Sequence, residues 1–399
     1  MALVLAGGAA RGAYEVGVIQ YLFEDVSHDL GRDVPLDILC GTSVGAINAC
    51  ALAAMADDPR RVQRMIKHWT ELRVGDVVRA DPRAMLAMVR GLFGSKNGGD
   101  EHARRGGILD PAGLTRIIAS SVPFNNIDEN LRAGRIHALT VSTTHVATGR
   151  TVVFVQRADP GLPEWSHDPT IIPRATRIRA EHALASAAIP FLFPAVRIDG
   201  EFHCDGGLRQ NVPLSPARRL GASGLIVINP RHVTPAVEAP IDHHAPFPGP
   251  LFLLGKTMNA LLLDRIDNDM DRLDRITSIL DAGERAYGPG FVDKINEELG
   301  YPRGKGIRPL RTVLIRASQD IGRLSADFVR SVGFRKRARG LVGRFIRTLA
   351  DGDPSREADL LSYLLFDGEF ARQLIELGRA DARAHHAELC ASFADHEAQ

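Results

Sequence analysis

The chain has few cysteines, few aromatic residues and almost no net charge. Its four cysteines lie far apart in the 399 residues and form no C-x-x-C pair. That spacing excludes a disulfide-rich secreted scaffold and the usual structural zinc sites, so we expect reduced thiols, no metal and a cytoplasmic location. The 49 basic residues balance 48 acidic ones, which gives no reason to expect a nucleic-acid partner.

Long apolar segments that enter or cross membranes are also scarce. Only about five apolar residues precede Gly7, without a positive charge, which is short of the ~7–15 that a signal peptide needs. Residues 38–56 carry no charge, but Gly41, Ser43 and Gly45 interrupt them. Because a turn inside a membrane span leaves backbone groups unpaired in lipid, we expect a buried strand, a sharp turn and a buried helix here.

The first 56 residues alternate between strand and helix patterns. Residues 2–6 and 35–40 are short apolar runs that predict buried strands. Residues 12–30 place apolar side chains on one helical face, and residues 44–56 form an alanine-rich helix. This alternation predicts an α/β fold with a mainly parallel sheet.

The rest of the first half continues the pattern. The predicted helices are 60–72, 82–92, one opened by Asp110-Pro111, and 174–188. The predicted strands are 136–142, 151–156, 195–198, 201–204 and 223–229, with a hairpin turn at Asp199-Gly200. Residues 94–107 lack an apolar period and predict a surface loop.

A proline-rich segment, 230–250, marks the best candidate boundary. We therefore divide the chain into a first domain, 1–230, and a mainly helical C-terminal region, 231–399. The helices predicted in that region are 251–282, 290–299, 324–349 and 354–391. One strand, 311–317, interrupts them, and a lone strand among helices is expected to rejoin the main sheet.

Three glycine-containing motifs carry chemistry, and the first is Gly41-Thr-Ser43-Val-Gly45. A G-x-S-x-G between a strand and a helix is the pattern of a nucleophile elbow, in which the serine hydroxyl is exposed on a tight turn. The helix N-terminus beside it favours a developing negative charge. The alternative is a glycine–serine turn with only a structural role.

The second motif is the loop Gly7-Gly8-Ala9-Ala10-Arg11-Gly12 after the first strand. It lacks the third-position glycine of a dinucleotide loop and the Gly-Lys-Ser/Thr of a P-loop. A glycine-rich turn at a helix start suits an oxyanion, and Arg11 can orient the loop or meet a phosphate. The alternative is a tight turn without a ligand.

The third motif is Asp205-Gly206-Gly207, which alone is more often a turn. Together the motifs supply an oxyanion loop, a nucleophile and a carboxylate, in that order. An α/β-hydrolase would also need a histidine after the acid, and its elbow would follow several strands. His203 lies two residues from Asp205 and either assists the aspartate or is a partly buried hairpin residue.

On these motifs the chain resembles the patatin-like phospholipases over residues 3–230, including the segments 185–194 and 211–214. The resemblance implies a three-layer α/β/α fold and a Ser–Asp dyad that needs neither histidine nor cofactor. Carried over by motif, Ser43 is the nucleophile, Asp205 the general base, and Gly8, Ala9 and Arg11 backbone oxyanion donors. The family's loop commonly has a glycine where this chain has Ala9.

The resemblance also implies a phospholipid or lysophospholipid substrate. Acyl transfer to a thiol or alcohol by the same dyad is one alternative, and a membrane-docking module with a weak catalytic site is another. Residues 330–347 contain seven basic residues and no acid, interleaved with apolar ones. They predict either peripheral membrane contact or a solvated helix face. Residues 251–263 predict a core helix or a lid.

Overall fold

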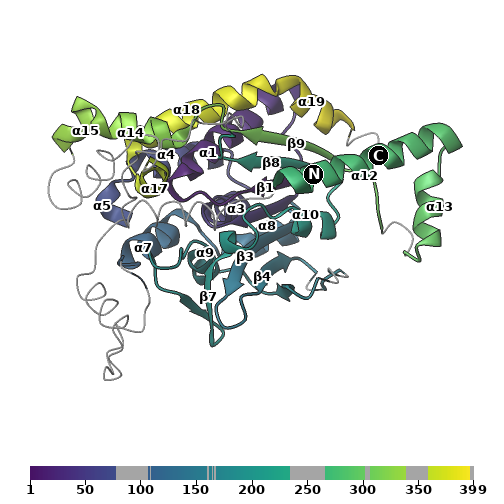
Figure 1. The fold of residues 1–399 in the computed structure, drawn as a ribbon, viewed down its shortest axis with the longest axis horizontal. Helices are drawn as coiled ribbons and strands as arrows, with labels where there is room; N and C mark the ends of the chain where they lie inside the picture. Colours follow the sequence, from purple (N-terminus) through teal and green to yellow (C-terminus); the bar gives the residue numbers. More distant parts are fainter. Residues whose placement is uncertain are drawn as a thin grey trace, which may run out of the picture.

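Figure 1 shows a computed structural model of the chain. It describes residues 1–77, 107, 109–159, 161–163, 165, 168–233, 266–301, 306–337 and 358–395. The helix expected over 82–92, the loop over 94–106 and the segment 251–263 lie outside the described residues, as do 338–347 of the basic stretch.

A nine-stranded mixed sheet forms the centre of the fold. Its main path runs in the order β5-β4-β3-β2-β1-β8-β9, and the hairpin β6–β7 joins it through antiparallel pairing of β7 with β3. The strands are β1 (Ala2–Leu5), β2 (Ile38–Thr42), β3 (Ala138–His145), β4 (Thr151–Arg157), β5 (Ile171–Ala175), β6 (Val196–Ile198), β7 (Glu201–Asp205), β8 (Gly224–Asn229) and β9 (Arg311–Arg316). The five strands β3, β2, β1, β8 and β9 are parallel to one another.

Helices cover both faces of this sheet (Figure 1). In the first part of the chain they are α1 (Gly12–Tyr21), α2 (Ser27–Leu30), α3 (Val44–Ala54), α4 (Arg61–Glu71), α5 (Val74–Val77), α7 (Ala112–Ser121), α8 (Asn126–Arg132), α9 (Ala180–Ser186) and α10 (Leu214–Arg219). In the C-terminal part they are α12 (Ile266–Tyr287), α13 (Phe291–Glu298), α14 (Ile321–Arg330), α15 (Val332–Arg337), α17 (Ala358–Leu364), α18 (Gly368–Ala384) and α19 (His386–Asp395).

The sheet separates two hydrophobic cores because side chains alternate between its faces. In β1, Leu3 and Leu5 enter the larger core, with α1, α3 and the C-terminal helices. Ala2 and Val4 of the same strand enter the smaller core, which α10 and α12 cover. The predicted three-layer α/β/α arrangement is therefore confirmed.

Most of the predicted elements are present, and the structure corrects three of the predicted helices. The helix predicted over 324–349 is interrupted at Ser331, between α14 and α15, and the one predicted over 354–391 is divided into α17, α18 and α19. The hairpin at Asp199-Gly200 is confirmed, and both residues have positive φ, 48° and 90°, as a tight hairpin turn requires. The helix predicted over 174–188 is wrong in its first part, where β5 extends to Ala175. Pairing with β4 makes this segment a strand, and α9 begins only at Ala180.

The C-terminal part packs intimately on the first domain. β9 continues the main sheet beside β8, and α18 lies along α1. Tyr14 Oη in α1 donates a hydrogen bond to Asp381 Oδ2 in α18 at 3.0 Å. The division of the chain at residue 230 stays a prediction. Among the described helices, none is long and apolar enough to span a membrane.

The contact between α1 and α18 depends on glycine at position 17. A Cβ there would lie 1.9 Å from the Ile375 carbonyl oxygen, which is too close for the backbones to keep their spacing. We therefore expect Gly17→Ala to lower the free energy of unfolding by about 2 kcal/mol. In α5, a Cβ on Gly75 would meet nothing within 4 Å. Chemical denaturation of both variants checks this, and equal stability of Gly17→Ala and Gly75→Ala would contradict it.

Candidate active site

The order of the strands brings the three motifs together. β1 and β2 are parallel neighbours, so the Gly7–Gly12 loop and the Ser43 turn both leave the carboxyl edge of the sheet. β3 lies on the other side of β2, and Asp205 at the end of β7 pairs with Thr143 of β3. Segments that lie more than 150 residues apart in the chain therefore meet at one edge.

Ser43 occupies the sharp turn between β2 and α3, with φ 55° and ψ −125°. This is a rare conformation for a residue with a side chain, and it is characteristic of strained functional positions. Glycines permit the turn: a Cβ on Gly41 would lie 2.3 Å from the Gly45 carbonyl oxygen, and one on Gly45 would lie 2.4 Å from the Leu5 carbonyl oxygen. The local sequence thus fixes where the hydroxyl lies.

The Ser43 hydroxyl donates a hydrogen bond of 2.6 Å to Oδ2 of Asp205. Both side chains are almost fully buried, with 4% and 1% exposure. Gly207 N donates to the other carboxylate oxygen, Oδ1, at 2.7 Å. The Gly207 amide thus holds Oδ1, while Oδ2 accepts the hydrogen bond from Ser43.

Burial raises the pKa of Asp205 to about 7, although the hydrogen bonds from Ser43 and Gly207 act in the opposite direction. An aspartate in water, with a pKa near ~3.9, is a weak base. With its pKa near neutrality, Asp205 is matched to accept a proton from a hydroxyl at physiological pH.

Ser186 in α9 holds the Ser43 turn through two hydrogen bonds. Its Oγ accepts a hydrogen bond from Ser43 N at 2.8 Å and donates one to the Ser142 carbonyl oxygen at 2.6 Å. The amide of Ser43 is therefore engaged inside the protein. Ser186 lies in the segment 185–194 that carries the family resemblance, but its sequence alone gave it no role.

The oxyanion loop presents fewer free amides than its sequence suggests. Three amides donate within the protein: Gly7 N to Asn211 O at 3.2 Å, Arg11 N to Gly8 O at 3.0 Å, and Gly12 N to Ala9 O. Among the described residues, no hydrogen bond uses the amide of Gly8 or Ala9. Of the three amides that the resemblance implies as oxyanion donors, that of Arg11 is thus engaged, and those of Gly8 and Ala9 are left.

Ala9 adopts the left-handed conformation, with φ 48°. A side chain disfavours this region, whereas the glycine that is common in the family tolerates it. Ala9 therefore keeps the amide in place at the expense of backbone strain.

Arg11 orients the loop from inside the protein. Its side chain is buried, its Nε donates to Ser362 Oγ at 2.8 Å, and its guanidinium lies 4.3 Å from the Tyr363 ring centroid. Both partners belong to α17. The C-terminal region thus holds the oxyanion loop, a contact across 351 positions that no local pattern could reveal.

A second buried carboxyl lies behind the elbow. Glu15 in α1 is fully buried and accepts a 2.7 Å hydrogen bond from Asn48 Nδ2 in α3. Burial raises the pKa of Glu15 well above its usual range. Asn48 also donates to the Gly12 carbonyl oxygen and accepts from Trp69 Nε1. These contacts tie α1, α3 and α4 together beside Ser43.

His203 is a buried hairpin residue. Its Nδ1 lies 3.0 Å from Thr143 Oγ1, and burial lowers its pKa to about 4, so the ring is neutral. Of the described residues, no group of three His, Cys, Asp or Glu side chains could hold a metal ion.

Comparisons with known proteins agree with this geometry. A family model for patatin-like phospholipases matches residues 3–218, which is more than half of the chain. This chain belongs to the patatin-like phospholipase family. The predicted family resemblance is confirmed. The family is one of hydrolases, of the phospholipase type, that take part in lipid degradation.

Named relatives of this patatin-like chain are lipid ester hydrolases. Triacylglycerol lipase ptl3 of Schizosaccharomyces pombe is 24% identical over 262 residues, 61% of this chain and 47% of the relative. The cGAMP-activated phospholipase of Pseudomonas aeruginosa is 29% identical over 213 residues, 53% of each. Patatin-like phospholipase domain-containing protein 7 of Rattus norvegicus is 27% identical over 231 residues, 57% of this chain and 13% of the relative.

The chain therefore spans less than two thirds of the length of these relatives. The solved structure of VipD from Legionella pneumophila covers 94% of this chain at 15% identity, with a TM-score of 0.31 and 66% of its own chain covered. Family membership supports lipid acyl hydrolase activity at the level of the family.

The strain at Ala9 can be measured by substitution. Left-handed backbone costs an alanine roughly 1–2 kcal/mol, more than the ~0.5–1 kcal/mol that glycine loses in chain entropy. We expect Ala9→Gly to leave the free energy of unfolding unchanged or to raise it by up to about 1 kcal/mol. The neighbouring Ala10 is buried and has no positive φ, so Ala10→Gly should lower it by about 1 kcal/mol or more. An equal decrease in the free energy of unfolding of the two variants, measured by chemical denaturation, would contradict the strain at Ala9.

Proposed function

We propose that this chain is a lipid acyl hydrolase of the phospholipase A or lysophospholipase type that uses Ser43 and Asp205 as a catalytic dyad. The observation that carries the proposal is the 2.6 Å hydrogen bond from the Ser43 hydroxyl to a buried carboxylate whose pKa lies near 7. Family membership and the names of the relatives support a lipid ester as the substrate.

In the first half of the reaction, Ser43 Oγ attacks the ester carbonyl as its proton moves to Asp205 Oδ2. The carbonyl oxygen becomes an oxyanion, which the amides of Gly8 and Ala9 are positioned to receive. When the tetrahedral intermediate collapses, the C–O bond to the alcohol breaks, and the alcohol takes the proton from Asp205. The acyl group remains on Ser43 as an ester.

In the second half, a water molecule enters the place of the alcohol. Asp205 accepts a proton from this water as the water oxygen attacks the acyl-enzyme carbonyl. The same amides hold the new oxyanion. Collapse breaks the bond to Ser43 Oγ, which recovers its proton from Asp205, and the fatty acid leaves.

The oxyanion donors carry a large share of the catalysis in this scheme. A single carboxylate provides no imidazolium to balance the developing charge, so the charge must be met by fixed N–H groups. Removal of one such donor in other enzymes costs roughly 2.7–4 kcal/mol. The engagement of Arg11 by Ser362 and Tyr363 keeps these donors in place.

Loss of either dyad member should abolish ester turnover. We expect Ser43→Ala and Asp205→Asn to lower kcat on a lysophospholipid by about 10³-fold or more, because nucleophile and base act as a unit. Fatty-acid release by purified protein measures this. Ser120→Ala, on the exposed face of α7, is the matched control and should retain full activity. Substantial turnover by Ser43→Ala would refute the proposal.

The pH dependence of turnover reports the state of Asp205. The carboxylate must be ionised to accept the proton, and its pKa in the folded protein is about 7. We therefore expect kcat/KM to fall about ten-fold per pH unit below that value and to level off above it.

An aspartate with its ordinary pKa would instead give a flat profile from about pH 5 to 8. Glu15→Gln removes the other buried carboxyl of raised pKa and should leave the profile unchanged. A flat wild-type profile, or a profile that moves with Glu15→Gln, would contradict the assignment of the base to Asp205.

A further inference from the structure

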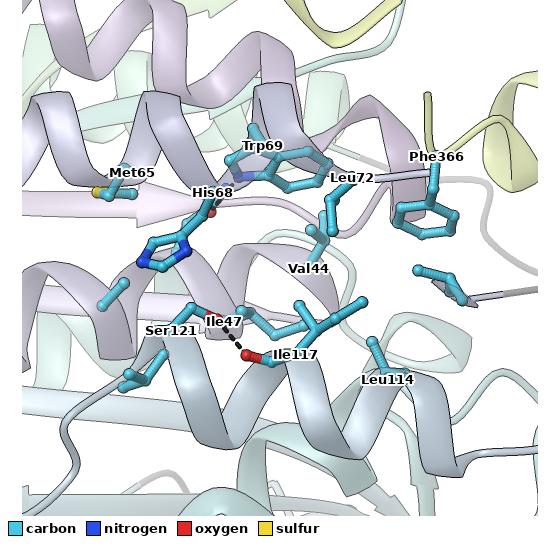
Figure 2. A pocket seen from close by; sticks show the side chains of 14 residues that line it. Val44, Ile47, Met65, His68, Trp69, Leu72, Leu114, Ile117, Ser121 and Phe366 are labelled. Atoms are coloured by element: carbon cyan, nitrogen blue, oxygen red, sulfur yellow. Dashed lines mark hydrogen bonds between the residues drawn. The ribbon is translucent and has the colours of Figure 1, made fainter. Parts of the chain in front are cut away.

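A narrow cavity of about 60 Å³ lies between three helices of the larger core (Figure 2). One face of each helix lines it, at helical spacing: Val44, Ile47, Asn48 and Ala51 from α3; Met65, His68 and Trp69 from α4; and Leu114, Ile117 and Ser121 from α7. Leu72, Val77, Val122 and Phe366 complete the lining. Phe366 comes from the C-terminal region, beyond the part of the chain that matches the family model.

The described residues that line the cavity offer no charge to a ligand. The amide of Asn48 is satisfied by Glu15, Gly12 and Trp69, and the Ser121 hydroxyl donates to the Ile117 carbonyl oxygen. Burial lowers the pKa of His68, so its ring is neutral at physiological pH. Because burying a charged or unpaired polar group here would be costly, the cavity suits a hydrocarbon chain.

Two of the residues that line this cavity connect it to the candidate active site. Val44, which lines it, directly follows Ser43 in the chain. Gly12, at the end of the oxyanion loop, packs against two lining residues: a Cβ on it would lie 2.4 Å from Val44 Cγ2 and 2.9 Å from Trp69 Cζ2. A chain attached to a carbonyl at Ser43 therefore has this cavity beside it.

The cavity also has a direction. Val44 begins α3, and Ala51 lies seven residues further along, about 10 Å away by helical rise. Figure 2 shows Leu114 and Phe366 toward one end, and Met65, His68 and Ser121 toward the other. The end marked by Ser121 is thus the end remote from the start of α3.

We propose that this cavity binds the acyl chain of the ester that Ser43 attacks, with the methyl end toward Ser121, His68 and Met65. The inference rests on the proposed function and adds that the remote end of the cavity selects chain length. A butyryl group stays near Val44, whereas an octanoyl group extends along α3 to Ser121.

A pair of adjacent serines provides a matched test. Ser120 and Ser121 both donate their hydroxyls to the Ile117 carbonyl oxygen, but only Ser121 lines the cavity, and Ser120 is exposed. We expect Ser121→Phe to lower kcat/KM for p-nitrophenyl octanoate by about ten-fold or more and to change that for the butyrate by less than about two-fold. Ser120→Phe should leave both esters unchanged.

Equal loss on both esters by Ser121→Phe, or no loss on either, would overturn the inference while leaving the proposed function intact. Thermal melting shows whether the variant folds. If it does not, Ser121→Leu, which places a smaller apolar side chain at the same end of the cavity, tests the same selective loss.

Binding to the Ser43→Ala protein separates the cavity from the chemistry. Trp69 lines the cavity and is one of only two tryptophans in the chain. Octanoate brominated at its terminal carbon should quench its fluorescence saturably, and adding Ser121→Phe should weaken this binding about ten-fold, whereas adding Ser120→Phe should not. Binding that depends on Ser121, combined with a wild-type protein that hydrolyses neither ester, would support the cavity and refute the hydrolase. Quenching that is equally strong with and without the Ser121→Phe substitution would refute chain binding in the cavity.

Discussion

The site depends on one buried hydrogen bond, which the Ser43 hydroxyl donates to Asp205. Burial of the carboxylate is unfavourable in itself, because water would solvate its charge better. The same burial raises the pKa of Asp205 to about 7, where it can take a proton from serine at neutral pH. In the proposed dyad, this unfavourable burial is what allows an aspartate to act as the base without a histidine.

Three adjacent strands make this arrangement possible. β1 and β2 deliver the oxyanion loop and Ser43 to one edge of the sheet, and β3 holds β7, which ends at Asp205. The backbone strain at Ala9 and Ser43 is tolerated because the residues packed around the two loops hold them in this conformation. One of those neighbours is the C-terminal region, through the contacts of α17 with Arg11 and of α18 with α1.

Local patterns predicted much of this from the sequence. Short apolar runs bounded by glycine located β1, β2 and β8, and G-x-S-x-G between a strand and a helix located the turn at Ser43. The lone strand predicted among the C-terminal helices, over 311–317, is expected to rejoin the sheet, and β9 pairs with β8.

What the sequence could not provide depends on contacts between distant segments. The start of the segment 174–188 is a strand because β4 lies beside it, which its own residues do not reveal. The loop Gly7–Gly12 contains several amides, and only the fold shows that those of Gly7, Arg11 and Gly12 donate hydrogen bonds within the protein. The role of Ser362 follows from no motif at all.

The rate at which a fluorophosphonate modifies Ser43 tests the central claim most directly, because this reagent needs an activated hydroxyl but no lipid-binding surface. Peptide mass spectrometry should find one adduct, on Ser43, that forms at least about a hundred-fold more slowly in Asp205→Asn. An adduct at another residue, or an equal rate on Ser43 in both proteins, would show that the hydrogen bond to Asp205 does not activate the serine.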